Sequence, residues 1–118
     1  CDDADWFNRR VAHDWQASLA RWPQLPKIDV MPHTRDHSVG PGYGRADAPV
    51  YALIAELARL EGIVLDPVYT GKAFHGLLSD LCDGFYQDVD DIIFVHTGGV
   101  FGLFAHEPQL TSAASGAS

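Results

Sequence analysis

The sequence predicts an α/β fold in which part of an open parallel sheet is flanked by helices. Two short apolar runs, residues 63–65 and 92–95, have the composition of buried strands. Between them, residues 72–82 show the apolar spacing of a helix, so the three segments form a βαβ unit. The connection in such a unit is almost always right-handed, and its two strands are parallel. We therefore expect the loops that follow the two strands to leave the same edge of one sheet.

Length and charge limit the kind of protein. The chain has 118 residues, enough for one small domain. With 16 acidic and 8 basic residues its formal net charge is −8, which argues against nucleic acid or an anionic membrane surface as a partner. No apolar run is long enough to span a bilayer, and we expect no signal peptide. The 2 cysteines are too few for a disulfide framework, and a reducing cytoplasm fits.

The first element is predicted to be a helix that begins after Asp2 or Asp3 and runs to about Trp22. Either aspartate can cap it by accepting a hydrogen bond from a free N–H group of the first turn. Pro23 ends it, because proline cannot continue the helical hydrogen bonding. Four apolar residues recur at helical spacing and are expected to form one buried face: Val11, Trp15, Leu19 and Trp22.

A second helix is predicted between Asp47 and Gly62. Asp47 is a suitable N-cap, and Pro49 suits the first turn. Gly62 supplies the left-handed conformation that a helix end needs. The first strand follows at once, and then a loop over residues 66–71 leads into the third helix.

The remaining residues are interpreted as an acidic loop over 83–91, a strand to residue 96 and a short helix over 100–105. Residues 111–118 are small and polar and predict a disordered tail, so the domain portion covers 1–110. Two or three strands make an incomplete α/β domain, and the chain opens on Cys1. We expect a processed chain, a fragment or one subunit. A nucleophilic Cys1 is an alternative for which no partner residues can be named.

The loops after the two strands carry the candidate site. Thr97 stands where the second strand ends, and Gly98 and Gly99 follow at the start of a helix. Glycines allow close approach of the backbone, and helix N-termini bind anions. Tyr69 and Thr70 lie in the loop after the first strand. Because ligands bind outside the carboxyl ends of the strands in open α/β sheets, we expect these residues to form two walls of one site.

Each of these positions also has a purely structural interpretation. Thr97 can be the N-cap of a tight turn, and Tyr69 can be a packing residue. Tyr43 lies between two glycines, which either let the backbone approach a ligand or simply form a loop. Lys72, at the start of a helix, is most often a solvated cation, and the glycines around it lack the spacing of a phosphate-binding P-loop.

The 6 histidines do not predict a metal site. His33 and His37 are spaced for one helical face, but their segment does not have a helical pattern and no third ligand has suitable spacing. The acidic residues of 83–91 lack the spacing of a calcium loop.

Three segments, taken in order, carry a specific resemblance. They are Gly-Pro-Gly-Tyr-Gly at 40–44, Ala-Arg-Leu-Glu-Gly-Ile-Val-Leu-Asp-Pro-Val-Tyr-Thr-Gly-Lys-Ala at 58–73 and His-Thr-Gly-Gly at 96–99. Together they resemble the C-terminal part of D-cysteine desulfhydrases, which group with 1-aminocyclopropane-1-carboxylate (ACC) deaminases among the fold type II, tryptophan-synthase-β-like pyridoxal-phosphate enzymes. The resemblance covers roughly residues 1–106. It implies the C-terminal portion of the large, cofactor-binding domain.

The resemblance implies that four residues bind pyridoxal 5'-phosphate: Thr97, Thr70, Gly98 and Gly99. The Thr97 hydroxyl matches the group that hydrogen-bonds the pyridine nitrogen, and Thr70 lies near the same nitrogen. A hydroxyl does not hold that nitrogen protonated as a carboxylate would, so the ring is a weaker electron sink, which suits β-elimination. The related deaminases carry Glu in place of Thr70 and Leu in place of Thr97, so both positions favour elimination.

Tyr69 and Tyr43 match two active-site tyrosines of the family, which would assist proton transfer or position the carboxylate and leaving group of the substrate. The implied reaction is α,β-elimination from a small amino acid, converting D-cysteine to pyruvate, sulfide and ammonia. Alternatives in the same class are a cysteate sulfo-lyase, a diaminopropionate ammonia-lyase or an ACC deaminase. The alternative of another class is a non-catalytic binding or structural subunit that retains the fold.

Three parts of the family pattern lie upstream of what this chain contains: the Schiff-base lysine, the Ser-Asn-His substrate run and the Gly-rich phosphate loop. The two lysines are Lys27 and Lys72, and Lys72 matches a family lysine that is not the Schiff base. We therefore expect an N-terminal companion chain that carries the Schiff-base lysine. A homodimer of the assembled enzyme in the cytoplasm is also expected, with neither nucleic acid nor membrane as partner.

Overall fold

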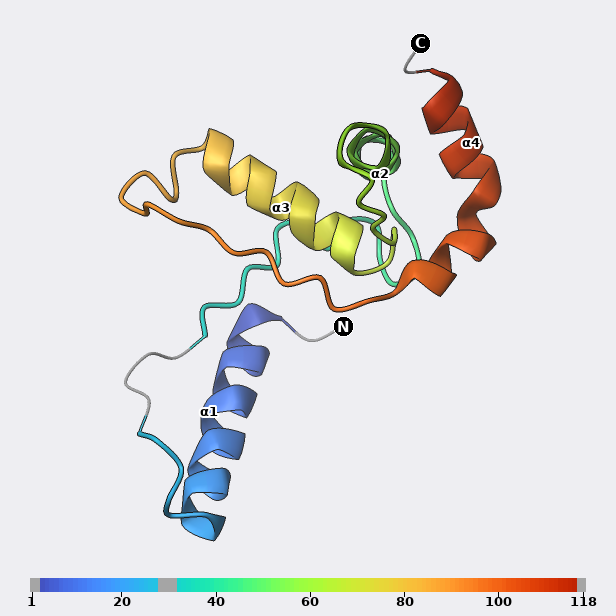
Figure 1. The fold of residues 1–118 in the computed structure, drawn as a ribbon. Helices are drawn as coiled ribbons and strands as arrows, with labels where there is room; N and C mark the ends of the chain where they lie inside the picture. The colour runs from blue at the N-terminus through green and yellow to red at the C-terminus, as the bar shows by residue number, and fades with distance from the viewer. Residues whose placement is uncertain (1–2, 28–31, 117–118) are drawn as a thin grey trace. The chain divides into compact units, whose positions relative to one another are not determined.

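The computed structural model describes residues 3–27 and 32–116. The predictions on Cys1 and on Asp2 as a cap lie outside the described residues. The chain divides into two compact units, residues up to Asp36 and residues from His37 onward. The helices, shown in Figure 1, are α1 (Ala4–Arg21), α2 (Ala48–Glu61), α3 (Thr70–Cys82), the 3₁₀ helix η1 (Val100–His106) and α4 (Glu107–Ser115).

The predicted α/β fold with a parallel sheet is wrong, because residues 3–27 and 32–116 contain helices and no strand. The apolar runs 63–65 and 92–96 contact each other through the His96 side chain, whose Nε2 lies 2.9 Å from the carbonyl oxygen of Val64. Among the described residues no backbone hydrogen bonds join the two runs, and a strand requires such a ladder. Ile93 and Val95 are 87% and 71% exposed, so the second run lacks the cover of a buried parallel strand.

The predicted helices of the second unit are confirmed. Helix α2 follows Asp47 and has Pro49 in its first turn, although the Asp47 side chain makes no capping hydrogen bond. It ends at Gly62, which has a φ of 67°. Helix α3 begins at Thr70, slightly earlier than predicted, and η1 occupies the place of the predicted short helix. The apolar spacing, Pro49 and Gly62 therefore located these helices correctly, although no side chain caps them.

Helix α1 belongs to the first unit and is capped as predicted. The Asp3 carboxylate accepts a hydrogen bond from the N–H of Trp6 at 2.8 Å. The predicted buried face is not buried, because Val11 and Trp22 are 38% and 49% exposed and no residue of α1 is buried. The 18 residues of α1 are also not apolar enough, and no helix in the described part of the chain could cross a membrane.

The core of the second unit lies between α2 and the segments around it. Val50, Ile54 and Leu65 are buried together, and Phe74 and Phe94 pack against this cluster. The rings of these two phenylalanines meet edge to face at 5.1 Å, which ties the segment before residue 99 to α3. The core thus lies directly beneath the loop that follows residue 65.

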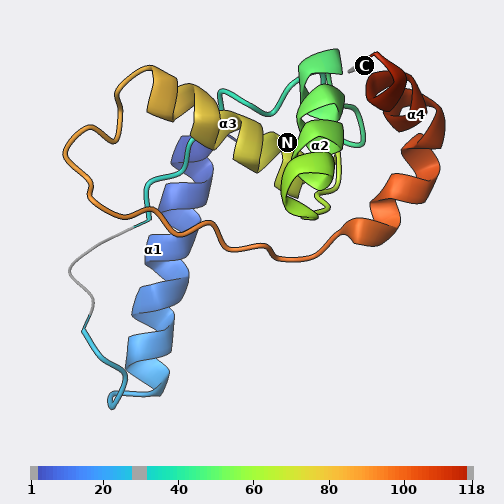
Figure 2. The ribbon, with the colours of Figure 1, turned by 45° about the horizontal axis from the view of Figure 1, so that its top comes forward.

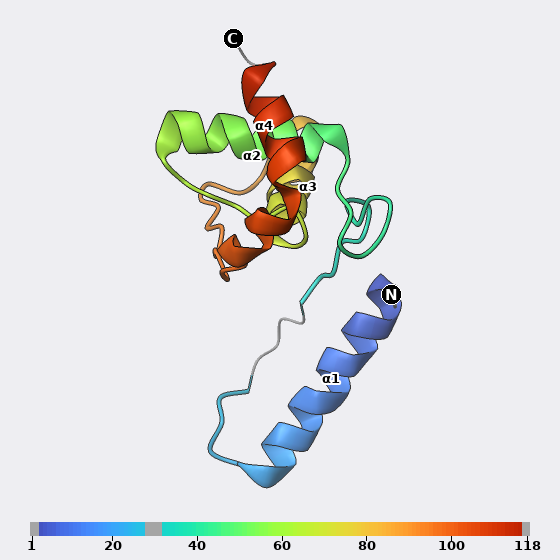
Figure 3. The ribbon, with the colours of Figure 1, turned by 90° about the vertical axis from the view of Figure 1, so that its right-hand side faces the viewer.

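Helix α4 lies against α2, as Figures 2 and 3 show from two directions. The Tyr51 hydroxyl on α2 is hydrogen-bonded to Nδ1 of His106, 2.8 Å away at the end of η1. Helix α4 covers most of the residues for which the composition predicts a disordered tail. The predicted boundary at residue 110 stays a prediction.

We expect Gly71→Ala to destabilise the second unit. A Cβ atom on Gly71 would lie 2.6 Å from the carbonyl oxygen of Asp66 and 2.8 Å from Cδ1 of Ile54. Such overpacking lowers the free energy of unfolding by about 1–3 kcal/mol. The measurement is urea unfolding followed by far-UV circular dichroism. Gly102→Ala is the control, since its Cβ atom would meet only Cβ of Asp66 at 3.8 Å. Equal losses in the two variants would contradict the prediction.

Candidate functional site

Asp66 stands at the centre of the candidate site and is 1% exposed. Its Oδ1 accepts hydrogen bonds from the N–H groups of Val68 and Tyr69 at 2.8 and 2.7 Å. Its Oδ2 accepts from the N–H group and the hydroxyl of Thr70 at 2.9 and 2.6 Å. These N–H groups have no partner inside α3, because Val68 and Tyr69 precede the helix and Thr70 is its first residue. Asp66 therefore anchors the loop that leads into α3.

The hydrogen bonds to Asp66 also determine its charge. Burial, the largest single influence, raises its pKa, but the hydrogen bonds from Thr70, Tyr69 and Val68 together outweigh burial and hold the pKa below the ordinary value. The carboxylate is consequently ionised at neutral pH. A negative charge at the start of a helix is further favoured by the helix dipole.

The Thr70 hydroxyl is engaged with Asp66. It donates its proton to Oδ2 and accepts a hydrogen bond from the Asp66 N–H group at 2.9 Å. Thr70 is 4% exposed. Its implied contact with a cofactor stays a prediction, and in this structure the side chain orders the loop.

The loop at 96–99 lies against Asp66. A Cβ atom on Gly99 would stand 2.5 Å from Oδ2 of Asp66, and Gly99 has a φ of 95°, so both the contact and the backbone demand glycine. At Gly98, with a φ of 103°, the position of a Cβ atom is open, with nothing within 4 Å. The backbone at Gly99 therefore packs closely against the Asp66 side chain, which holds the loop before α3.

His96 holds this loop from its other end. Its Nδ1 accepts the N–H group of Gly98 at 3.0 Å, which leaves Nε2 to donate to the carbonyl oxygen of Val64 at 2.9 Å. Between them, Thr97 is exposed, and its hydroxyl makes no hydrogen bond within the described residues. A free hydroxyl on an anchored loop is available to a ligand.

The side chains of the two predicted tyrosines, Tyr43 and Tyr69, contact each other. Their hydroxyl oxygens lie 2.9 Å apart, and the rings approach edge to face at 6.1 Å between centroids. Tyr43 and Tyr69 are 73% and 57% exposed. The hydrogen bond to Tyr43, together with slight burial, raises the pKa of Tyr69 above its ordinary value. Tyr69 therefore keeps its proton at neutral pH. Only one of the two hydroxyls donates in the hydrogen bond between them, so the other O–H group is free to donate to a ligand.

The interpretation of Lys72 as a solvated cation is wrong. Lys72 is 8% exposed, and its Nζ donates to the carbonyl oxygens of Val39 and Gly42 at 2.7 and 2.9 Å. Sequence reasoning also missed the roles of Asp66 and His96. A signal existed only for Asp66, because an aspartate before a proline at the start of a helix is a common turn former.

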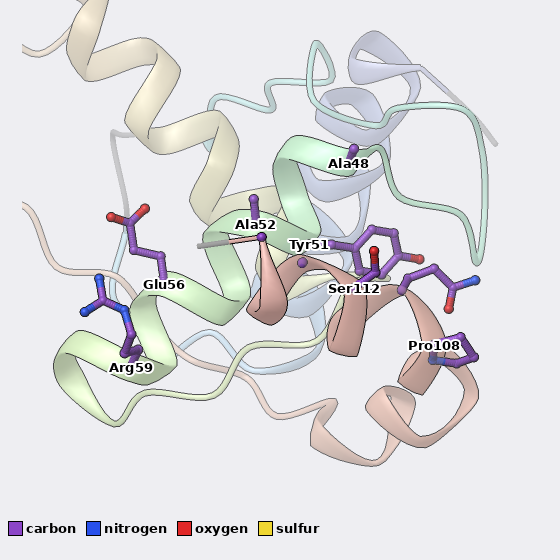
Figure 4. Close-up of a pocket in the computed structure, with 10 residues that line it drawn as sticks. Ala48, Tyr51, Ala52, Glu56, Arg59, Pro108 and Ser112 are labelled. Carbon is purple, nitrogen blue, oxygen red and sulfur yellow. The ribbon is translucent and has the colours of Figure 1, made fainter. Parts of the chain in front are cut away.

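A separate groove lies between α2 and α4 (Figure 4) and contains none of the predicted site residues. It is lined by Ala48, Tyr51, Ala52, Glu56, Arg59, Pro108, Gln109, Ser112, Ala113 and Gly116. In the part of the chain that the structure describes, no group of three or more His, Cys, Asp or Glu side chains is arranged to hold a metal ion.

The second unit thus brings Tyr43 to Tyr69, and Thr70 and Gly99 to Asp66. This surface carries two exposed phenols and one hydroxyl without a partner among the described residues, which are groups that hydrogen-bond polar ligands. Among the described residues Thr97 makes no hydrogen bond to either tyrosine. Asp66 contacts both loops, through a hydrogen bond to Tyr69 and through its close approach to Gly99.

No family model matches the chain. Curated proteins do match, and each of the following is named D-cysteine desulfhydrase. One from Yersinia pestis strain Pestoides F is 44% identical over 110 residues, which is 91% of this chain. One from Klebsiella pneumoniae subsp. pneumoniae and one from Yersinia enterocolitica are 48% and 51% identical over 75 residues, 64% of this chain. The chain is a homologue of the D-cysteine desulfhydrases, as its motifs predict.

The match covers only part of each relative. The chain spans 32% of the Yersinia pestis protein and 23% of the other two. The predicted resemblance to the C-terminal part of these proteins is confirmed.

Proposed function

We propose that this chain forms part of a pyridoxal-phosphate-dependent lyase that performs α,β-elimination on a small amino acid, with D-cysteine converted to pyruvate, sulfide and ammonia. The homologous relatives named D-cysteine desulfhydrase support this proposal. The observation that carries it is the position of two loops at Asp66. The loop with Tyr69 is hydrogen-bonded to Asp66, the loop with Thr97 packs against it at Gly99, and Tyr43 is hydrogen-bonded to Tyr69.

The residues present fit one edge of the cofactor. The hydroxyl of Thr97 is exposed and has no partner within the described residues, and the space beside Gly98 is open. A hydroxyl donates to an unprotonated ring nitrogen without adding charge. When bound, pyridoxal phosphate supplies the electron sink for elimination. We propose Thr97 as the hydrogen-bond partner of the pyridine nitrogen of the cofactor, with Gly98 and Gly99 beside the ring. Thr70 orders the loop before α3 through its hydrogen bond to Asp66.

The amine that anchors the cofactor is proposed to come from a companion segment. The Lys72 ammonium group is held by two carbonyl oxygens, and Lys27 belongs to the first unit. This observation also favours the second candidate, a non-catalytic binding subunit, which the experiment below separates from the lyase.

The tyrosine pair acts as a proton donor in this proposal. The raised pKa of Tyr69, caused first by its hydrogen bond to Tyr43, keeps the Tyr69 phenol protonated at neutral pH. A protonated phenol hydrogen-bonds a substrate carboxylate or gives a proton to a departing sulfur, and it does not abstract a proton. Tyr43 and Tyr69 therefore position the substrate and assist the leaving group.

The test compares Thr97→Val with Thr97→Ser in the protein assembled with its companion segment. Sulfide release from D-cysteine is measured in the presence of pyridoxal phosphate, with L-cysteine and cysteate as competing substrates. Loss of one hydrogen bond to the ring, worth about 1–2 kcal/mol, is expected to lower kcat roughly fivefold to thirtyfold in the Val variant. The Ser variant keeps the hydroxyl and is expected to stay near the parent rate.

Two results would overturn the proposal. Sulfide release that is equal in the Val and Ser variants would remove Thr97 from the site. An assembled protein that binds no pyridoxal phosphate, measured by equilibrium dialysis, would identify the chain as a binding or structural subunit.

A further inference from the structure

The loop at 39–44 bears Tyr43 but offers that side chain little packing. Tyr43 is 73% exposed, and its described contacts are the hydroxyl and ring of Tyr69. Three glycines with positive φ angles shape the loop: Gly40, Gly42 and Gly44. A glycine-rich loop loses much conformational entropy when it is ordered, so something must hold its backbone in place.

Lys72 makes that attachment. Its Nζ donates to Val39 at 2.7 Å and to Gly42 at 2.9 Å, at the beginning of the loop and just before Tyr43. Hydrogen bonds from a charged donor are stronger than those from a neutral one. The Lys72 side chain is also 8% exposed, so its alkyl stem is packed rather than mobile.

Tyr69 is fixed from the same helix end. Its N–H group is held by Asp66 at 2.7 Å, and Lys72 lies within the first turn of α3 that follows. Tyr69 is therefore fixed because it directly precedes α3 in the chain. Tyr43 is fixed because the Lys72 ammonium group binds the backbone of its loop. The distance between the two hydroxyls depends on both attachments.

We propose that Lys72 is a positioning residue that holds the 39–44 loop by two backbone carbonyls and thereby places the Tyr43 hydroxyl against that of Tyr69. This inference rests on the proposed function, in which the two phenols face the substrate. Lys72 itself touches neither substrate nor cofactor in this role.

The test uses the full 118-residue chain and follows the titration of Tyr69 by NMR with ¹³C-labelled tyrosine. Because the hydrogen bond to Tyr43 is the first cause of the raised pKa of Tyr69, losing that contact lowers the pKa toward its ordinary value. Tyr43→Phe gives the size of that change directly. Lys72→Met, which keeps an unbranched apolar stem and removes the N–H donors, is expected to give the same change.

The double variant distinguishes positioning from a general loosening of the fold. If Lys72 acts through Tyr43, adding Lys72→Met to Tyr43→Phe shifts the Tyr69 pKa no further. A folded Lys72→Met variant whose Tyr69 pKa remains at the parent value would overturn the proposal. A further shift in the double variant would also overturn it.

A second measurement on the unmodified chain keeps the proposal testable if Lys72→Met does not fold. The ammonium protons of Lys72 are expected to exchange with solvent more slowly than those of the exposed Lys27, detected by ¹⁵N NMR. Equal exchange at the two lysines would overturn the proposal. Neither measurement requires cofactor or substrate, so failure of the proposed reaction is distinguishable from failure of this inference.

Discussion

Replacement of Asp66 by alanine is expected to lower the free energy of unfolding of residues 37–118 by about 3–5 kcal/mol, because several buried donors lose an ionised acceptor together. Those donors are the N–H groups of Val68, Tyr69 and Thr70 and the hydroxyl of Thr70. The substitution also removes the carboxylate that packs against Gly99 and leaves a space there. Urea unfolding followed by far-UV circular dichroism measures the loss.

Asp47→Ala is the matched control. Asp47 also precedes a helix, but it is exposed and its side chain makes no capping hydrogen bond. Its removal is expected to change the free energy of unfolding by less than about 0.5 kcal/mol. A small loss in both variants would show that Asp66 does not anchor the site.

The same carboxylate predicts a dependence of stability on pH. Hydrogen bonding from Thr70, Tyr69 and Val68 outweighs the opposing effect of burial and holds the pKa of Asp66 below its ordinary value. Its contribution is therefore complete above the unfolded pKa of about 4 and is lost as the pH falls through the lower folded pKa. The other carboxyl groups titrate in this range too, so the relevant quantity is the difference between the parent chain and Asp66→Asn, which should shrink on acidification. A constant difference would contradict the prediction.

Gly99→Ala is expected to lower the free energy of unfolding by about 2–5 kcal/mol, the sum of backbone strain and overpacking. A Cβ atom there would meet Oδ2 of Asp66 at 2.5 Å and Cγ at 2.8 Å, and both atoms are held by the hydrogen bonds of the α3 loop. The loop must move away, and Thr97 moves with it. We expect sulfide release by the assembled protein to fall along with the stability.

Gly98→Ala separates the two causes. Gly98 has a φ of 103°, close to the 95° of Gly99, but a Cβ atom on it would have nothing within 4 Å. This variant carries the strain alone, with a loss of about 1–2 kcal/mol. Should the two alanine variants unfold at the same urea concentration, the close approach of Gly99 to Asp66 would not contribute, and the link between the two loops would be refuted.

The local sequence predicted most helices correctly because their end signals act within a few residues. Asp3 caps α1 through Trp6, and Gly62 ends α2 in a left-handed conformation. The sheet was predicted incorrectly for a different reason. Apolar runs such as 92–96 show that a segment suits burial, but a strand also needs a neighbour that pairs with its backbone, and none of the described segments does so.

The site was predicted in part. Tyr43 and Tyr69 were predicted to share a site, and they are hydrogen-bonded to each other, while their catalytic roles and the cofactor contacts of Thr97, Thr70, Gly98 and Gly99 stay predictions. The polar residues that hold this arrangement were not foreseen. The residues next to Lys72 in the sequence predict an exposed cation, because its partners Val39 and Gly42 lie more than two dozen residues earlier.

The sequence by itself determined most of the helices, through local end signals such as Asp3 and Gly62. It also determined the homology to D-cysteine desulfhydrases, through motifs whose order and spacing are specific. Only the tertiary structure showed that Asp66 is a buried, ionised anchor and that Lys72 holds the loop of Tyr43. The physical reason is the distance along the sequence over which each interaction acts. Caps and turns are local interactions, whereas the burial and pairing of a charge depend on segments that meet only after the chain has folded.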